Sequence, residues 1–168
     1  MNTTPPSLVS ALAMNRRSCL SAVLMLGVAR IIHAAPAASL PIAKSLREEL
    51  ALALKGGNPL LVMVSLDACP FCKVARESYL SPMRAEQGLS IVQVNMHHAE
   101  TVKDFKGVVL TQDELVHLWK VTLAPTVLFF GRDGAEVAPR LVGIGSPDFY
   151  GNKLDQRMEQ ARAAIKAP

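Results

Sequence analysis

The chain has 168 residues, of which half are hydrophobic and 19% are charged, with a formal net charge of +4. The first 37 residues hold three of the 18 basic residues and none of the 14 acidic ones, which leaves a charge of +1 for residues 38–168. The basic balance therefore mostly describes the amino terminus and gives no argument for nucleic-acid binding. Residues 38–168 suit one domain with its own core.

The amino terminus has the three zones of a secretory signal peptide. Residues 15–18 carry two arginines, residues 20–32 are mostly apolar, and residues 35–37 have the small-x-small pattern of a cleavage site. The apolar zone is broken by an arginine and is too short to span a bilayer. We therefore expect residues 1–37 to be cleaved and residues 38–168 to be exported as one domain without a membrane span.

Two details of this leader stay open. Met14 begins a more typical signal peptide than Met1, so either residue can be the start. The pair Arg16 and Arg17 is compatible with a twin-arginine signal, but Cys19 stands where that pattern prefers an aromatic residue, so ordinary secretion is favoured. Cys19 precedes the apolar zone and is expected to be removed with the leader.

The first elements predicted in the domain are a helix, a strand and a second helix. Residues 42–54 have apolar residues at helical spacing with charged residues between them, and two glycines follow. Residues 59–66 form an almost unbroken apolar run, too short for a helix and typical of a strand buried on both faces. Residues 72–80 predict a helix that Pro82 kinks or ends, with residues 83–87 as a second piece.

Cys69 and Cys72 stand in a Cys-Pro-Phe-Cys motif where the buried strand turns into the second helix. The free amides and the dipole of a first helical turn stabilise a thiolate, so Cys69 is expected to be the reactive cysteine. Cys72 lies one turn further in and is expected to be less exposed, so that Cys69 attacks and Cys72 resolves the mixed disulfide. Pro70 fits the first turn, where its missing N–H costs nothing, and Phe71 completes the active-site dipeptide.

Three other interpretations of the cysteine pair are weaker. A structural staple would close a very short loop and so add little stability. Half of a zinc site needs two more ligands, and the domain offers only the pair His97 and His98. A chance motif is improbable in a domain with no other cysteine. The favoured redox centre is therefore the disulfide Cys69–Cys72, with no metal and no other cofactor.

A second strand, a long connection and a third helix are predicted next. Residues 90–96 are rich in β-branched residues and predict a strand parallel to the first, reached by a right-handed crossover. Residues 97–110 form a long connection of mixed character, in which the two histidines are expected to be solvated. Residues 111–114 have the pattern of a capping box, which begins a helix that runs to about Val121.

The end of the domain predicts two strands and a helix. Residues 127–130 indicate a buried strand, residues 131–134 a tight turn, and residues 136–143 an antiparallel partner whose internal proline suggests an edge position. Ser146 is expected to cap a last helix that runs to about Ala164. No repeat or linker divides the domain.

This order of elements resembles the thioredoxin fold over most of residues 40–165. Two motifs carry the resemblance: Cys-Pro-Phe-Cys at residues 69–72, and Ala124-Pro125-Thr126, which is similar to the cis-proline motif of that superfamily. The resemblance implies an α/β fold with a central mixed sheet flanked by helices. It also implies a cis Ala124–Pro125 bond that faces the cysteine pair.

The resemblance implies a thiol-disulfide oxidoreductase whose clients are cysteine-containing proteins that bind along Ala124 and Pro125. More narrowly, residues 141–151 and the long loop after the second strand are similar to exported thioredoxin-like proteins encoded with bacterial sulfur-oxidation clusters. That likeness implies a periplasmic reductase that serves sulfur oxidation and receives electrons from a membrane thiol reductase. The alternatives are a periplasmic oxidant or isomerase, and a binding module whose cysteines are vestigial or hold metal with His97 and His98.

Three features depart from thioredoxin itself. The dipeptide between the cysteines is Pro-Phe in place of Gly-Pro, and Ala68 replaces a tryptophan. Met63 stands where thioredoxin buries an aspartate that helps to deprotonate the resolving cysteine. The dipeptide is similar to that of glutaredoxins, yet an exported chain does not meet the cytosolic glutathione pool. These differences leave the redox potential and the proton route open.

Overall fold

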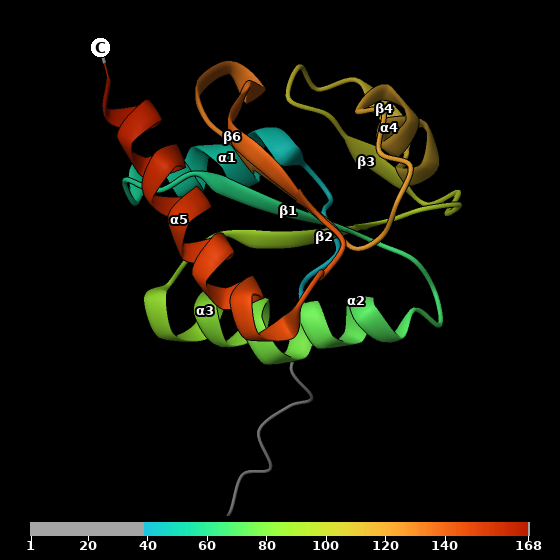
Figure 1. Cartoon of the computed structure of the whole chain (residues 1–168). Helices are drawn as coiled ribbons and strands as arrows, with labels where there is room; N and C mark the ends of the chain where they lie inside the picture. The colour runs from blue at the N-terminus through green and yellow to red at the C-terminus, as the bar shows by residue number, and fades with distance from the viewer. Residues whose placement is uncertain (1–38, 168) are drawn as a thin grey trace, which may run out of the picture. The chain divides into compact units, whose positions relative to one another are not determined.

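Four strands form the central sheet of the fold: β1 Leu60–Ser65, β2 Ile91–Asn95, β5 Thr126–Phe130 and β6 Glu136–Val142. Their order is β2-β1-β5-β6 (Figure 1). β1 pairs in parallel with β2 and antiparallel with β5, and β5 pairs antiparallel with β6. The predicted mixed sheet, with a parallel pair of strands first and an edge strand last, is confirmed.

The computed structural model describes residues 39–167. The leader expected over residues 1–37 lies outside the described residues. Among residues 39–167, no helix combines the length and the apolar character that crossing a bilayer requires.

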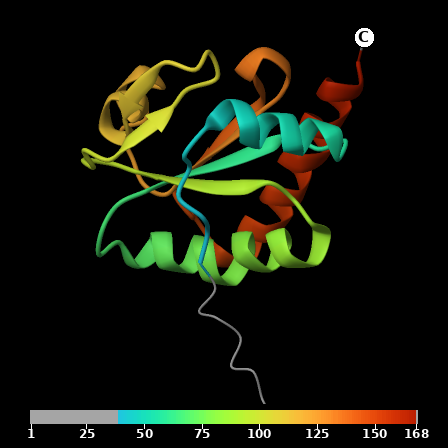
Figure 2. The same cartoon turned by 180° about the vertical axis from the view of Figure 1, so that it is seen from behind.

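Helices cover both faces of this sheet (Figures 1 and 2). The helical segments are α1 Leu46–Lys55, α2 Pro70–Val74, a π-helical segment Ala75–Leu80, α3 Ser81–Gln87, α4 Gln112–Leu118 and α5 Pro147–Lys166. Leu61 and Met63 of β1 pack in one core with α2, α3 and α5, whereas Val62 and Val64 pack in a second core with α1 and α4. One strand therefore contributes to two cores, because successive side chains point to opposite faces.

The helix that follows β1 is longer than the sequence predicted. The apolar pattern covered residues 72–80, but the helix begins at Pro70, the residue expected in its first turn, and it continues through the π-helical segment into α3. Pro82 does not end it, and residues 83–87 do form the expected second piece. The π-helical turns lie just before the proline, where the N–H of Ser81 donates to the carbonyl of Arg76, five residues back. This wider winding accommodates a residue that has no N–H of its own.

The prediction of a helix that starts at residue 42 is wrong at its beginning. α1 starts at Leu46, and the hydroxyl of Ser45 accepts a bond from the N–H of Glu48. The preceding segment runs along the outer edge of β2, where Gln93 N–H donates to the carbonyl of Pro41 at 2.8 Å. Ala43 N–H donates to the carbonyl of Gln93 at 2.9 Å. These residues are extended because they satisfy backbone groups of β2 that would otherwise lack partners.

The connection predicted over residues 97–110 contains a small hairpin, which the sequence did not indicate. Its strands are β3 Thr101–Lys103 and β4 Val109–Thr111, paired antiparallel. Phe105 in the hairpin loop packs against Phe130, with ring centroids 4.7 Å apart. Gly134 lies so close to the ring of Phe105 that a side chain at this position would collide with it. The hairpin is therefore attached to the second core by an aromatic contact.

The two helices predicted after residue 111 are both present, as α4 and α5, but their ends differ from the prediction. The capping box of Thr111 and Glu114 is present, and the hydrogen bonds from Thr111 lower the pKa of Glu114. α4 ends at Leu118 rather than at Val121, because Lys120 adopts a left-handed φ of 54°. α5 extends to Lys166, and the side chain of Ser146 makes no capping hydrogen bond.

Tyr150 in α5 generates a prediction about stability at high pH. Its side chain is 2% exposed and packs edge-on against Tyr79, and its hydroxyl has no hydrogen-bond partner within residues 39–167. Burial raises the pKa of Tyr150 to about 12, whereas tyrosine in an unfolded chain has a pKa of about 10. The unfolded state therefore ionises first, and stability should fall as the pH rises from about 10 through about 12.

The variant Tyr150→Phe removes this ionisation. We expect its free energy of unfolding to match that of the wild type within about 1 kcal/mol at pH 7, because no hydrogen bond is lost. At about pH 11 the variant should be the more stable protein by roughly 1 kcal/mol, measured by urea denaturation. Parallel loss of stability in both proteins above pH 10 would contradict this prediction.

Candidate active site

The cysteine pair lies at the start of α2, directly after the turn that follows β1. Cys69 is the cap residue of the helix, and Cys72 is joined to it by a disulfide with the two Cα atoms 5.2 Å apart. The N–H of Cys72 donates to Sγ of Cys69 at 3.1 Å. The side chain of Cys72 is fully buried, whereas Cys69 is half-buried. The structure thus places the expected attacking cysteine outside and the expected resolving cysteine inside.

The surroundings of Cys72 are apolar on the side of the sheet. Cys72 and Met63 are both fully buried in the core that α2, α3 and α5 share with the sheet. Met63 offers no group that takes up or releases a proton. The side chain of Met63 therefore cannot pass a proton to or from a thiol at Cys72.

The turn before the cysteines is held in an uncommon backbone conformation. Ala68 has a φ of 53°, and His97, which follows β2 at the same end of the sheet, has a φ of 61°. Such conformations cost of order 1 kcal/mol and persist where neighbouring contacts fix them. One such contact joins the two loops, since Nε2 of His98 lies 2.9 Å from Oδ2 of Asp67.

The proline turn lies against the cysteine motif. The Ala124–Pro125 peptide bond is cis, Pro125 is buried, and Ala124 packs against the core that contains Cys72. Residues of both motifs line a cavity of about 220 Å³. It is lined by Phe71, Leu123, Ala124, Pro125, Gly143, Ile144 and Gly145. The structure therefore brings together the two motifs that the sequence singled out.

Two large apolar side chains that line this cavity are exposed. Phe71 is 63% exposed and Leu123 is 52% exposed. Leu123 and the segment from Gly143 to Gly145 were not predicted as site residues. They become visible only once β6 and α5 are placed beside the cysteine helix, because nothing in their own sequence pattern marks a site.

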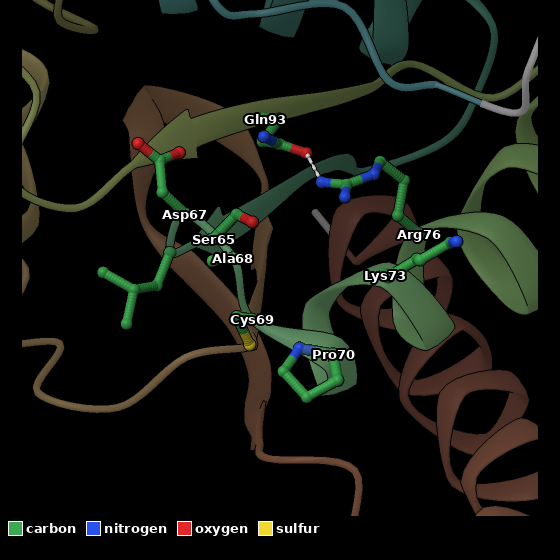
Figure 3. A pocket seen from close by; sticks show the side chains of 9 residues that line it. Ser65, Asp67, Ala68, Cys69, Pro70, Lys73, Arg76 and Gln93 are labelled. Atoms are coloured by element: carbon green, nitrogen blue, oxygen red, sulfur yellow. Dashed lines mark hydrogen bonds between the residues drawn. The ribbon is translucent and has the colours of Figure 1, made fainter.

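A second cavity, of about 300 Å³, includes Cys69 in its lining (Figure 3). It is lined by Ser65, Leu66, Asp67, Ala68, Cys69, Pro70, Lys73, Arg76 and Gln93. Nη1 of Arg76 donates to Oε1 of Gln93 at 2.7 Å, and Nε2 of Gln93 donates to Oδ1 of Asn95 at 2.6 Å. The sequence held one signal of this cavity, since Gln93 is a polar residue in the middle of an apolar strand.

The histidines predicted to be solvated each have an acidic neighbour. His98 contacts Asp67, and Nδ1 of His97 lies 3.3 Å from Oδ1 of Asp113. Within residues 39–167 no group of three or more His, Cys, Asp or Glu side chains is arranged to hold a metal ion.

A family model of the thioredoxin-like domain matches residues 46–159, which include both cysteines and the proline turn. The chain belongs to this family. No curated protein sequence matches it.

Solved structures of thioredoxin-like proteins also resemble the chain. Oxidised thioredoxin O2 from Arabidopsis thaliana is 18% identical, with 73% of this chain and 94% of that chain covered and a TM-score of 0.48. Trxlp from Edwardsiella tarda is 27% identical, with 67% and 97% covered and a TM-score of 0.45. The periplasmic thioredoxin SoxS from Paracoccus pantotrophus is 17% identical, with 61% and 98% covered and a TM-score of 0.40.

The unequal burial of the two cysteines predicts unequal labelling in this thioredoxin-like domain. After reduction, iodoacetamide at neutral pH should modify Cys69 at least about 100-fold faster than Cys72, because a buried thiol is out of reach of the reagent. Mass spectrometry of peptides from quenched samples measures both rates. In guanidinium chloride the two rates should become similar. Equal labelling of the folded protein would show that Cys72 is accessible.

Proposed function

We propose that the protein is a thiol-disulfide oxidoreductase that exchanges the Cys69–Cys72 disulfide with cysteines of client proteins. The observation that carries this proposal is the position of the pair. A half-buried Cys69 caps a helix and is bonded to a fully buried Cys72, and the neighbouring Phe71 lines a cavity together with the cis-proline turn. A disulfide that closes so short a loop contributes little to stability, which favours a chemical role.

In the proposed reaction, the thiolate of Cys69 attacks one sulfur of a client disulfide and the other client sulfur leaves as a thiolate. The thiolate of Cys72 then attacks Sγ of Cys69, which releases the second client thiolate and forms the Cys69–Cys72 disulfide. The protein loses two electrons, and the client gains two electrons and two protons. The hydrogen bond from the N–H of Cys72 to Sγ of Cys69 would stabilise a thiolate at Cys69.

Client binding is proposed at the proline turn. Within residues 39–167, neither the N–H nor the C=O of Ala124 makes a hydrogen bond, so both can pair with an extended client segment. The neighbouring carbonyl of Pro125 is engaged, because it accepts from Gly143 N–H at 2.7 Å. The exposed Phe71 and Leu123 offer apolar contacts to the residues that flank the client cysteine.

The direction and the location of the reaction are proposed from the sequence. The leader pattern supports export to the periplasm, where a membrane thiol reductase would return electrons to the oxidised pair. The similarity of residues 141–151 to exported proteins of sulfur-oxidation clusters supports a reductase in that process. An oxidant or isomerase would use the same pair at a different redox potential.

A metal-binding module is the less favoured alternative. It would need the sulfurs of Cys69 and Cys72 together with His97 and His98. In the structure the two sulfurs are bonded to each other, and each histidine contacts a carboxylate instead.

The roles of the two cysteines predict the behaviour of single variants. Reduced Cys72→Ser should form a stable mixed disulfide with insulin, used as a model protein disulfide, because Cys69 can attack but nothing resolves the adduct. Cys69→Ser should form none, and the wild type should turn over with dithiothreitol. Non-reducing electrophoresis separates these cases. Adducts that accumulate with Cys69→Ser in place of Cys72→Ser would reverse the proposed roles.

The redox potential tests the proposed direction. For a reductase we expect a value near that of thioredoxin, about −270 mV, whereas a strong periplasmic oxidant such as DsbA lies near about −120 mV. Equilibration with dithiothreitol and glutathione buffers, followed by alkylation and mass measurement, gives the potential. A redox potential near about −120 mV would show that the protein is an oxidant and not a reductase, and it would not contradict the proposed exchange reaction.

A further inference from the structure

The cavity beside Cys69 that contains Arg76 has no role in the exchange reaction as described above. Its walls come from three elements: the end of β1 and the turn after it, the start of the cysteine helix, and β2. We call it the arginine cavity. Its volume of about 300 Å³ lies at the lower end of the range for small-molecule sites.

Arg76 is held in place by a buried side chain. Gln93 is 7% exposed, accepts from Nη1 of Arg76 at 2.7 Å and donates to Asn95 at 2.6 Å. Figure 3 shows the guanidinium turned toward Gln93. Both Oε1 and Nε2 of Gln93 make a hydrogen bond, so the orientation of its amide group is fixed. The fixed amide in turn orients the guanidinium of Arg76.

The charge of Arg76 is not compensated by an acid. Within residues 39–167 Arg76 forms no ion pair, and its bond to Gln93 uses one of the five N–H groups of a guanidinium. Asp67 is the acidic residue that lines the arginine cavity, and its carboxylate contacts His98. Lys73 adds a second positive charge to the lining, although its ammonium points away from Cys69 in Figure 3.

We propose that the arginine cavity binds a carboxylate that the substrate carries next to its disulfide, with Arg76 as the group that binds it. This inference rests on the proposed exchange reaction and narrows its substrates to disulfides with a negatively charged arm. Guanidinium and carboxylate pair through two parallel hydrogen bonds, for which Arg76 has free donors. Residues 38–168 carry a net charge of only +1, so a preference for anions must come from this local arrangement.

A small disulfide R–S–S–R reacts through the same two bond exchanges as a protein disulfide, with the same number of electrons and protons transferred. Cys69 attacks one sulfur and one R–S⁻ leaves; Cys72 then attacks Cys69 and the second R–S⁻ leaves. Two electrons pass from the cysteine pair to the small disulfide, and the two protons that the cysteines release neutralise the two leaving thiolates. Arg76 takes no part in these bond changes and binds the arm of R.

Three small disulfides of similar length test the preference. They are 3,3′-dithiodipropionate, which is anionic, bis(2-hydroxyethyl) disulfide, which is neutral, and cystamine, which is cationic. The oxidation rate of the reduced protein by each is divided by the rate of dithiothreitol with the same disulfide, which removes differences in intrinsic reactivity. We expect a normalised preference of about fivefold for the anionic over the neutral compound, which falls as salt is added.

Arg76→Gln should bring this ratio close to one, because the rate with the anionic disulfide should fall and the rate with the neutral disulfide should fall much less. Arg84→Gln is the matched control, since it removes an exposed arginine from α3, outside the arginine cavity, and should keep the preference. A peptide disulfide with glutamate or glutamine beside its cysteine repeats the comparison for a carboxylate from a protein client. If glutamate is preferred over glutamine in the peptides and the small disulfides show no preference, the carboxylate that binds Arg76 belongs to a protein client.

The outcomes separate this inference from the proposed function. Exchange with the neutral disulfide and no preference for charge, in either small disulfides or peptides, would overturn the inference alone. The inference also fails if Arg76→Gln slows all disulfides equally, because Arg76 would then act on Cys69 itself, or if Arg84→Gln abolishes the preference. Absence of exchange with every disulfide would overturn both.

Discussion

Burial of β1 on both faces is the constraint that organises the molecule. Its apolar side chains point alternately into two cores, and each is worth roughly 1.5 to 3 kcal/mol when removed from water. A strand of this kind needs a neighbour at each edge and a layer of helices on each face. The chain supplies the helix of one layer at once, by turning from Ser65 into the helix at Pro70. The cysteines therefore lie directly after a strand that is buried along its whole length.

The same constraint explains the unequal chemistry around the two sulfurs. Cys72 points to the core and lies with Met63 among apolar side chains, whereas Cys69 stays at the surface beside polar groups of β1, β2 and the helix. In an apolar setting a thiol is favoured over a thiolate, and a thiolate is favoured beside cations and amide donors. The proposed division of attack and resolution thus rests on the different surroundings of two identical side chains that lie less than one helical turn apart.

The features that the sequence predicted well are those set by short-range pattern. The apolar run at residues 59–66, the β-branched run at residues 90–96 and the capping box at Thr111 each contain enough local signal to define an element, and each is present. The cysteine motif and the proline turn could be paired in advance because the resemblance to a known fold related them.

The features that were missed depend on partners distant in the sequence. Val102 is the buried residue of the short strand β3, so no periodicity reveals this strand. Residues 41–43 are extended because the edge of β2 needs partners, although their own pattern favours a helix. The arginine cavity joins Arg76 and Gln93, which are 17 positions apart. In each case a tertiary contact decided a conformation that local preference left undecided.

The segment that lies along β2 has a consequence for self-association. A four-stranded sheet has two outer edges at which the backbone of a second copy could add, a common route to aggregation. Pro41 and Ala43 occupy the outer backbone groups of β2, while β6 carries Pro139 and an irregular register beside Leu128. Neither edge therefore offers a regular row of donors and acceptors. Within residues 39–167 the backbone groups of Ala124 stay free, so the proposed client site does not depend on either outer edge of the sheet.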